Sequence, residues 1–234
     1  MFYNEFAKYY DKIFPLKETT VSFLDQRFKK GKILDVACAT GNYSIALAKR
    51  GYKMTGFDLD ELMISEAKDK AKQVSNAIEF TVNSMEEYSM KHPFDHAFCI
   101  GNSLVHLKSN DMIKAFLKKI YQGLNQNGHL VLQVINYDRI LNHNITSLPT
   151  IHNDPYHFER RYTYDGRYIH FHTALVIEEE VLKNTVKLYP LKSKEILQIL
   201  NEVGFKTIDI YGGFDESPFN PDQSIPIVID AVKK

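Results

Sequence analysis

The chain is predicted to fold as an α/β protein with a mostly parallel seven-stranded sheet, helices on both faces and an antiparallel last strand. Short apolar runs alternate with longer helical patterns from Gly31 to about Asn136, which is typical of a parallel sheet. After residue 140 the pattern becomes a polar–apolar alternation, which predicts a small antiparallel β insertion after the fifth strand. A helix and two further strands then complete the sheet.

The elements of the first part follow from the spacing of apolar residues. Strands are predicted where β-branched and apolar residues cluster, at 32–37, 52–59, 78–84, 94–103 and 129–136. Helices are predicted where apolar residues recur every three or four positions, at 42–51, 61–74 and 111–124. Asp60 directly precedes the second of these helices, and we expect it to cap that helix.

The stretch 156–190 predicts two or three antiparallel strands. Asp165-Gly166 is a strong hairpin signal, and the glutamates at 178–180 are expected to form a solvated turn. A helix at 192–204 and strands at 205–212 and 225–234 follow. We therefore predict one domain made of residues 1–140 and 191–234, and an insertion at 141–190.

Composition narrows the class of partner. Lys+Arg and Asp+Glu both number 29, so no overall field attracts nucleic acid or an anionic membrane. No apolar run approaches the ~20 residues that span a bilayer, and the first residues lack a signal-peptide pattern. Cys38 and Cys99 lie in apolar segments, as expected of a reduced, cytoplasmic protein. We expect neither a nucleic-acid nor a membrane partner, and the chain is either a monomer or a homodimer.

The loop after the first predicted strand reads ILDVACATGN, residues 33–42. Its small residues Ala37, Ala39 and Gly41 are spaced two and two, unlike the G-x-G-x-x-G of dinucleotide loops. The alanine methyl groups would also obstruct a pyrophosphate, so a nicotinamide-dependent reductase is the least favoured enzyme class. Asp58 ends the second strand, where a carboxylate can accept hydrogen bonds from both ribose hydroxyls. The pattern thus favours an adenosine without phosphates.

Four motifs, ILDVACATG, GFDLDELM, FTVNSMEEY and FDHAFCIGNSLVHL, occur in the order and spacing of one known family. With them the chain resembles the class I S-adenosylmethionine-dependent methyltransferases. The sequences of its motifs are most similar to those of glycine/sarcosine N-methyltransferases, at residues 34–41, 99–107 and 136–141. The likeness covers residues 1–141 and returns more generically in YGGFDESPFNPD, 211–222. It implies a Rossmann-like fold, S-adenosyl-L-methionine as cofactor and S-adenosyl-L-homocysteine as product.

The resemblance also implies a set of cofactor contacts. In chain order these are Tyr3, Tyr10, Ala37, Gly41, Asp58, Leu59, Met63, Ser84, Met85 and Ile100. Ala37 and Gly41 would line the methionine part of the cofactor, and Asp58 would bind the ribose. The adenine would be surrounded by Leu59, Met63, Ser84 and Met85. Relatives often carry Asp where Ser84 stands. The Ile100 carbonyl would accept a hydrogen bond from the cofactor's amino group. The two tyrosines would close over the cofactor, unless they only pack an N-terminal helix.

Methyl transfer from a sulfonium is an in-line displacement, so the protein mainly supplies alignment and a dry pocket. An amine acceptor must arrive neutral, and a nearby polar group can take its proton. The candidate catalytic residues are Asn102, His106 and Tyr137, which follow the fourth and fifth predicted strands. His106 either acts as a base or only stabilises the loop in which it lies.

One position departs from the glycine-methylating relatives. They carry an arginine immediately before NYD, where it binds the substrate carboxylate, and this chain has Ile135. An aliphatic side chain cannot pair with a carboxylate. Glycine is therefore not the expected acceptor, unless Arg139, Arg160 or Arg161 compensates.

The insertion is expected to cover the acceptor pocket. His170 and His172 have a spacing that metal sites use, but no Cys or acidic cluster accompanies them, so we predict no metal. We expect the histidines to form a half-polar wall over the cleft.

The leading hypothesis is a methyltransferase that acts on nitrogen or oxygen of a small-molecule acceptor. An RNA methyltransferase is an alternative, which the zero net charge and the lack of a basic arm disfavour. A second alternative is a non-catalytic cofactor-binding regulatory protein of the same fold, for which Ala37, Ala39 and Ser84 would be the signs.

Overall fold

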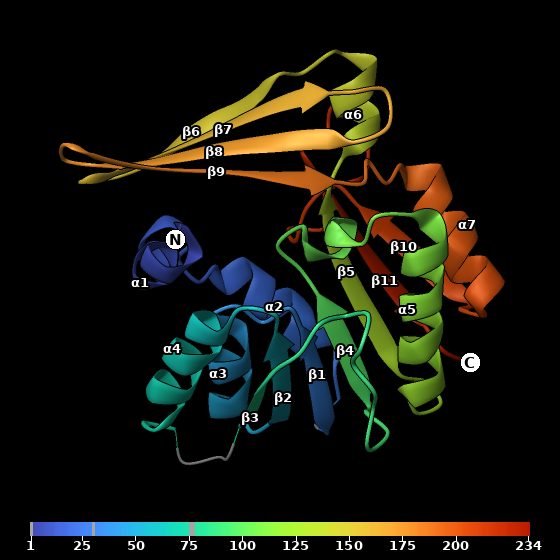
Figure 1. Cartoon of the computed structure of the whole chain (residues 1–234). Helices are drawn as coiled ribbons and strands as arrows, with labels where there is room; N and C mark the ends of the chain where they lie inside the picture. The colour runs from blue at the N-terminus through green and yellow to red at the C-terminus, as the bar shows by residue number, and fades with distance from the viewer. Residues whose placement is uncertain (1, 30, 75–77) are drawn as a thin grey trace.

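The computed structural model describes residues 2–29, 31–74 and 78–234, with side chains from Phe6 onward, and these residues contain two β-sheets (Figure 1). The strands of the larger sheet are β1 (Lys32–Val36), β2 (Lys53–Asp58), β3 (Glu79–Val82), β4 (His96–Cys99), β5 (His129–Ile135), β10 (Thr207–Tyr211) and β11 (Pro226–Val232). Their order is β10-β11-β5-β4-β1-β2-β3. Strands β1 to β5 are parallel, and β11 is antiparallel to both of its neighbours, so the predicted sheet is confirmed.

Helices cover both faces of this sheet, as predicted. They are α2 (Glu18–Arg27), α3 (Asn42–Lys49), α4 (Glu61–Ala71), α5 (Asn110–Gly123) and α7 (Ser193–Val203), while α1 (Phe2–Ile13) and α6 (Tyr137–Asn142) lie at the carboxyl end of the strands, next to the smaller sheet (Figure 1). Successive side chains of a strand point to opposite faces. Ile33 and Val131 therefore pack with α2 and α3, while Leu34 and Leu132 pack with α5 and α7.

Local signals set several boundaries. Asp60 caps α4 as predicted, since its Oδ1 accepts hydrogen bonds from the backbone N–H groups of Leu62 and Met63 at 2.9 and 3.0 Å. The strand predicted at 94–103 ends earlier, at Cys99. Gly101 and Asn102 adopt positive φ angles of 79° and 68°, which end the strand and lead into a short 3₁₀ helix, Ser103–His106.

The smaller sheet is antiparallel and lies within the predicted insertion. Its strands are β6 (Ser147–Asn153), β7 (Tyr156–Tyr164), β8 (Ile169–Ile177) and β9 (Glu180–Leu188), paired in that order. It has four strands where two or three were predicted. The missed strand, β6, contains Pro149 and a register shift between Leu148 and Ile151, and both disguise an edge strand. Asp165 forms the predicted turn by accepting backbone hydrogen bonds from Arg167 and Tyr168.

One face of the smaller sheet is turned toward the rest of the protein. Figure 1 shows this sheet across the carboxyl end of the parallel strands, with α1 between it and α4. Phe158 of β7 packs on Phe6 of α1 and on Phe14, the residue after this helix, with ring centroids 5.5 Å apart in both pairs. On β8, Ile169 and Leu175 are buried on the same face. This inner face thus covers the edge of the larger sheet where its parallel strands end.

His170 and His172 are on the opposite face, so the expectation that they line the cleft is wrong. His170 interacts with Asp165 at 2.7 Å, and His172 with Thr163 and Thr185, each at 2.9 Å. The reason is the two-residue period of a strand, which turns 170 and 172 outward when 169 and 175 are buried.

The residues that the structure describes lack two features. None of their helices combines the length and apolar character needed to cross a bilayer. Nor do their His, Cys, Asp and Glu side chains form a group of three or more that could hold a metal ion.

Candidate functional site

The loop between β1 and α3 has the backbone of a glycine-rich loop, although two of its glycine positions are alanines. Ala37, Ala39 and Gly41 all have left-handed φ angles, of 55°, 48° and 74°. This conformation costs a residue with a side chain roughly 1–2 kcal/mol. The surrounding structure therefore holds the loop in place, and one restraint is a hydrogen bond from Ala39 N to Asp58 Oδ2 at 2.8 Å.

Replacing Gly41 with alanine is expected to destabilise the protein by at least about 1–2 kcal/mol. A Cβ atom there would lie 2.5 Å from Phe80 Cζ, in addition to the strain of φ 74°. The opposite change, Ala39→Gly, is expected to stabilise it by about 0.5–1 kcal/mol, because relief of strain exceeds the added chain entropy. Urea unfolding measures both changes. Equal stabilities of the two variants would contradict the left-handed loop.

Asp58, at the end of β2, joins this loop to its own strand. Its Oδ2 accepts from Ala39 N at 2.8 Å, and its Oδ1 accepts from Asp60 N at 3.0 Å. Burial raises the pKa of Asp58, while these two hydrogen bonds oppose that shift. A carboxylate has about four acceptor sites, so about two remain for a ligand diol. The carboxylate is thus preoriented and still has acceptor capacity.

An apolar surface adjoins Asp58. Leu59 is 71% exposed, directly after the strand, and forms an open apolar surface that a flat base could cover. Met63 is buried against α1 and Met85 is half-buried against the main core. Ser84 Oγ accepts a hydrogen bond from Glu87 N at 3.0 Å, so this hydroxyl already stabilises a turn. These four residues, predicted to surround adenine, therefore differ widely in their exposure.

Helix α1 lies over the loop and is tied to it through Asp11. Asp11 Oδ1 accepts from Thr40 Oγ1 at 2.5 Å and from Asn42 Nδ2 at 2.8 Å, and Oδ2 pairs with Lys70 Nζ at 2.6 Å. Burial, and after it the charge of Asp58, raise the pKa of Tyr10, which packs against the same apolar cluster as Ala39 of the loop. The Tyr3 side chain lies outside the described residues, and its role stays a prediction.

Asn102 connects the ends of β4 and β5. Its Oδ1 accepts from Ile135 N at 2.9 Å, and its Nδ2 donates to Tyr137 Oη at 3.1 Å. Tyr137 is fully buried, and burial raises the pKa of its phenol. The Ile100 carbonyl accepts from Ser103 Oγ at 3.0 Å and keeps a second lone pair. In this geometry Asn102 and Tyr137 fix the loop on which His106 stands.

His106 differs from these two residues because its side chain reaches solvent. Its ring makes no hydrogen bond with any side chain or backbone group in the described part of the chain. The protein packed around it disfavours the charged form and lowers the pKa of the imidazole. A neutral, unpaired imidazole near the ends of β4 and β5 is able to accept a proton.

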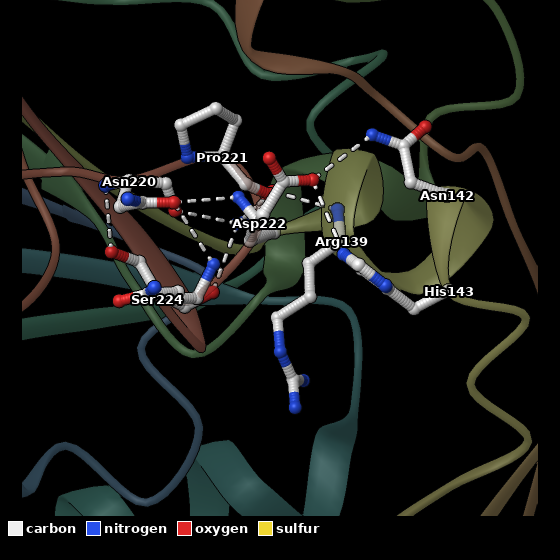
Figure 2. A network of polar contacts seen from close by, with 9 residues as sticks. Arg139, Asn142, His143, Asn220, Pro221, Asp222 and Ser224 are labelled. Carbon is white, nitrogen blue, oxygen red and sulfur yellow. Dashed lines mark hydrogen bonds and ion pairs between the residues drawn. The ribbon is translucent and has the colours of Figure 1, made fainter.

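Asn136 is a site residue that the sequence analysis did not single out. It is 1% exposed, and its Oδ1 caps α6 by accepting from Arg139 N at 3.2 Å. Its Nδ2 donates to the carbonyls of Pro221 and Ser224, both at 2.9 Å, and so anchors the loop between β10 and β11. Figure 2 shows this loop next to α6, with the Arg139 guanidinium pointing away from the contacts. The position of Asn136 directly before a short helix was the sequence signal for its capping role.

Asp35 was also missed. It lies in β1, is 3% exposed and accepts a hydrogen bond from Ser44 Oγ at 2.7 Å. Burial raises the pKa of Asp35 to about 8, although the Ser44 hydrogen bond acts in the opposite direction. The sequence signal for this buried carboxyl was an acidic residue inside the apolar run KILDVA.

Comparisons with known proteins agree with the fold. A methyltransferase-domain family model matches residues 33–128. The glycine/sarcosine N-methyltransferase of Aphanothece halophytica is 31% identical over 195 residues, which are 80% of this chain and 70% of that protein. A glycine/sarcosine/dimethylglycine N-methyltransferase of Actinopolyspora halophila is 28% identical over 207 residues, but the match spans only 35% of it.

Solved structures share the fold at lower identity. An S-adenosylmethionine-dependent methyltransferase from Clostridium acetobutylicum superposes with a TM-score of 0.85 at 16% identity, covering 99% of this chain and 98% of that one. A doubly wound sheet with an acid at the end of its second strand is a geometry that can hold the ribose of an adenosine. With the relatives above, the chain belongs to the class I S-adenosylmethionine-dependent methyltransferases, and S-adenosylmethionine is its cofactor.

Proposed function

We propose that this methyltransferase acts on a nitrogen or oxygen atom of a small-molecule acceptor. The observation that carries the proposal is the cover over the strand ends. Phe158 packs on α1 above the β1 loop, and Tyr162 shares the main core with Tyr137 after β5. A site covered by a sheet and a helix suits a small molecule better than a nucleic-acid chain. The balanced charge of the protein agrees with this.

The cofactor roles are proposed from the same geometry. Asp58 holds the ribose with its remaining acceptor sites, and the exposed side chain of Leu59 packs on the adenine, near Met63, Ser84 and Met85. Ala37 and Gly41 line the methionine part, and the Ile100 carbonyl accepts from its amino group. Tyr10 closes the site through the attachment of α1 to the loop.

When bound, S-adenosylmethionine supplies a methyl group on a sulfonium, which the acceptor's nucleophile displaces in line. His106 is proposed to take the proton that the nucleophile loses, because its imidazole is neutral and unpaired. Asn102 and Tyr137 are proposed as positioning residues, since their polar atoms bond to each other and to Ile135 N. Ile135 carries no charge, so glycine is not proposed as the acceptor.

Incubation of the protein with methyl-labelled cofactor and a fractionated metabolite extract tests the proposal. The label is expected in a small molecule, identified by mass, and His106→Gln is expected to lower kcat about 10²-fold or more while cofactor affinity stays unchanged. Addition of total RNA to a parallel reaction is the control. Transfer of the label to RNA instead of a small molecule would refute the proposal.

A further inference from the structure

The inner face of the smaller sheet carries one arginine, at a position above the strand ends. Side chains of β7 alternate between faces, so Arg160 shares the inner face with Phe158 and Tyr162 on either side of it. Phe158 packs on Phe6 of α1 at 5.5 Å, and Tyr162 belongs to the core cluster of Tyr137. Arg160 therefore lies between the helix over the cofactor loop and the residues that follow β5.

The Arg160 guanidinium lacks a counter-charge. Its Nη2 donates to the Pro149 carbonyl at 2.6 Å, while its Nε is buried without a hydrogen-bond partner. Within residues 6–29, 31–74 and 78–234, no carboxylate forms an ion pair with it. Burial accordingly lowers the pKa of Arg160. Buried charges are normally paired, because removal from water is costly.

Two other arginines of this chain have carboxylate partners. Arg27, whose side chain is 11% exposed, pairs with both Glu216 and Asp230 at 3.2 Å. Arg161, next to Arg160 but on the outer face, is 71% exposed and pairs with Glu159 at 3.0 Å. The missing partner of Arg160 is thus a local feature of the inner face.

Two uncharged polar side chains extend the site across the sheet. In the strand register Arg160 is directly opposite Thr173, and Thr173 is opposite Asn184. Thr173 is 8% exposed. The next inner-face neighbours on β8, Phe171 and Leu175, are apolar, so Arg160, Thr173 and Asn184 form a polar row between two apolar clusters.

We propose that the polar row binds a carboxylate of the methyl acceptor, with Arg160 as the ion-pairing residue and specificity determinant. The inference rests on the proposed small-molecule function. A carboxylate fits because its planar oxygens accept two parallel N–H bonds from a guanidinium, and Arg160 has its Nε–H free. Of the arginines that could replace the one absent at Ile135, Arg161 faces outward. Arg139 is half-buried like Arg160, but it lies on α6 and not on the inner face of the smaller sheet.

The experiment compares Arg160→Met with Arg161→Gln as the matched control. Without ligand, Arg160→Met is expected to raise Tm by about 2–4 °C, because it removes a half-buried guanidinium that has no carboxylate partner among the described residues and a buried Nε without a hydrogen bond. With S-adenosylhomocysteine bound, a panel of amino acids and their carboxamides is added as probes. At least one amino acid is expected to raise the Tm of the wild type and of Arg161→Gln, but not that of Arg160→Met, and its carboxamide is expected to have no effect.

Methyl transfer to the acceptor found in the extract gives the second measurement. Arg160→Met is expected to raise KM about 10²-fold with a smaller change in kcat, and Arg160→Lys to restore part of the loss. A lower Tm for Arg160→Met, or unchanged KM, would overturn the inference and leave the proposed function intact. Transfer of the labelled methyl group to RNA would overturn both this inference and the proposed function.

Discussion

Replacing Asp58 with alanine is expected to weaken S-adenosylhomocysteine binding about 100-fold or more. A hydrogen bond to a charged group contributes about 1.5–3 kcal/mol, and each 1.4 kcal/mol is a tenfold change in affinity. We propose that Asp58 forms two such bonds to the ribose hydroxyls, because Ala39 N and Asp60 N hold its carboxylate in place. Isothermal titration calorimetry measures the change.

The control for Asp58 is its neighbour Asp60. Asp60→Ala removes the cap of α4 and is expected to cost about 1 kcal/mol of stability while affinity changes less than about threefold. Since Asp58→Ala also frees Ala39 N, Asp58→Asn is the second variant, which keeps one acceptor oxygen to hold the loop. Wild-type affinity in both Asp58 variants would remove the ribose assignment.

Asp35→Asn is expected to stabilise the protein strongly at pH 8 and to flatten its stability profile. The pKa of Asp35 is about 8 in the folded state, against an ordinary value of 3.8. Between these values the unfolded chain has lost the proton and the folded chain retains it, so stability falls as pH rises, by up to about 1.4 kcal/mol per unit. The penalty is absent below pH 3.8 and complete above about pH 8.

Urea unfolding at pH 5, 6, 7 and 8 measures this difference. The gap between Asp35→Asn and the wild type is expected to widen at each step. Asp69→Asn, at an exposed position of α4, removes one carboxyl elsewhere and is expected to leave the profile unchanged. Ser44→Ala removes the hydrogen bond that lowers the pKa of Asp35, so the decline should extend to higher pH. Parallel profiles for the wild type and Asp35→Asn would rule out a buried, protonated Asp35.

Much of the larger sheet could be predicted because its elements carry their own signals. The strands β1, β2 and β5 are apolar runs, α5 has one apolar face, and Asp60 marks the start of α4. Strand β6 was missed because Pro149 and a register shift interrupt its alternation. Its pairing with β7 depends on a partner strand, which a local pattern does not reveal.

The site could be predicted only in part. Asp58 and the loop from Ala37 to Gly41 are sequence-local, so their position at neighbouring strand ends follows from the parallel sheet. The outward direction of His170 was not predictable, because the face of a strand is set by what packs against it. The buried state of Asp35 and the tie between Asp11 and Thr40 depend on contacts between distant segments.

The strands of the larger sheet, most of the helices that cover it and the class of cofactor were determined by the sequence alone, because apolar spacing and short motifs encode them locally. Only the tertiary structure decided which charges are left without partners. Arg160 and Arg161 are adjacent in sequence and identical in chemistry, yet packing pairs one with Glu159 and buries the Nε of the other unpaired. The physical reason is that the cost of a charge depends on its surroundings, which form only when the smaller sheet closes over the strand ends.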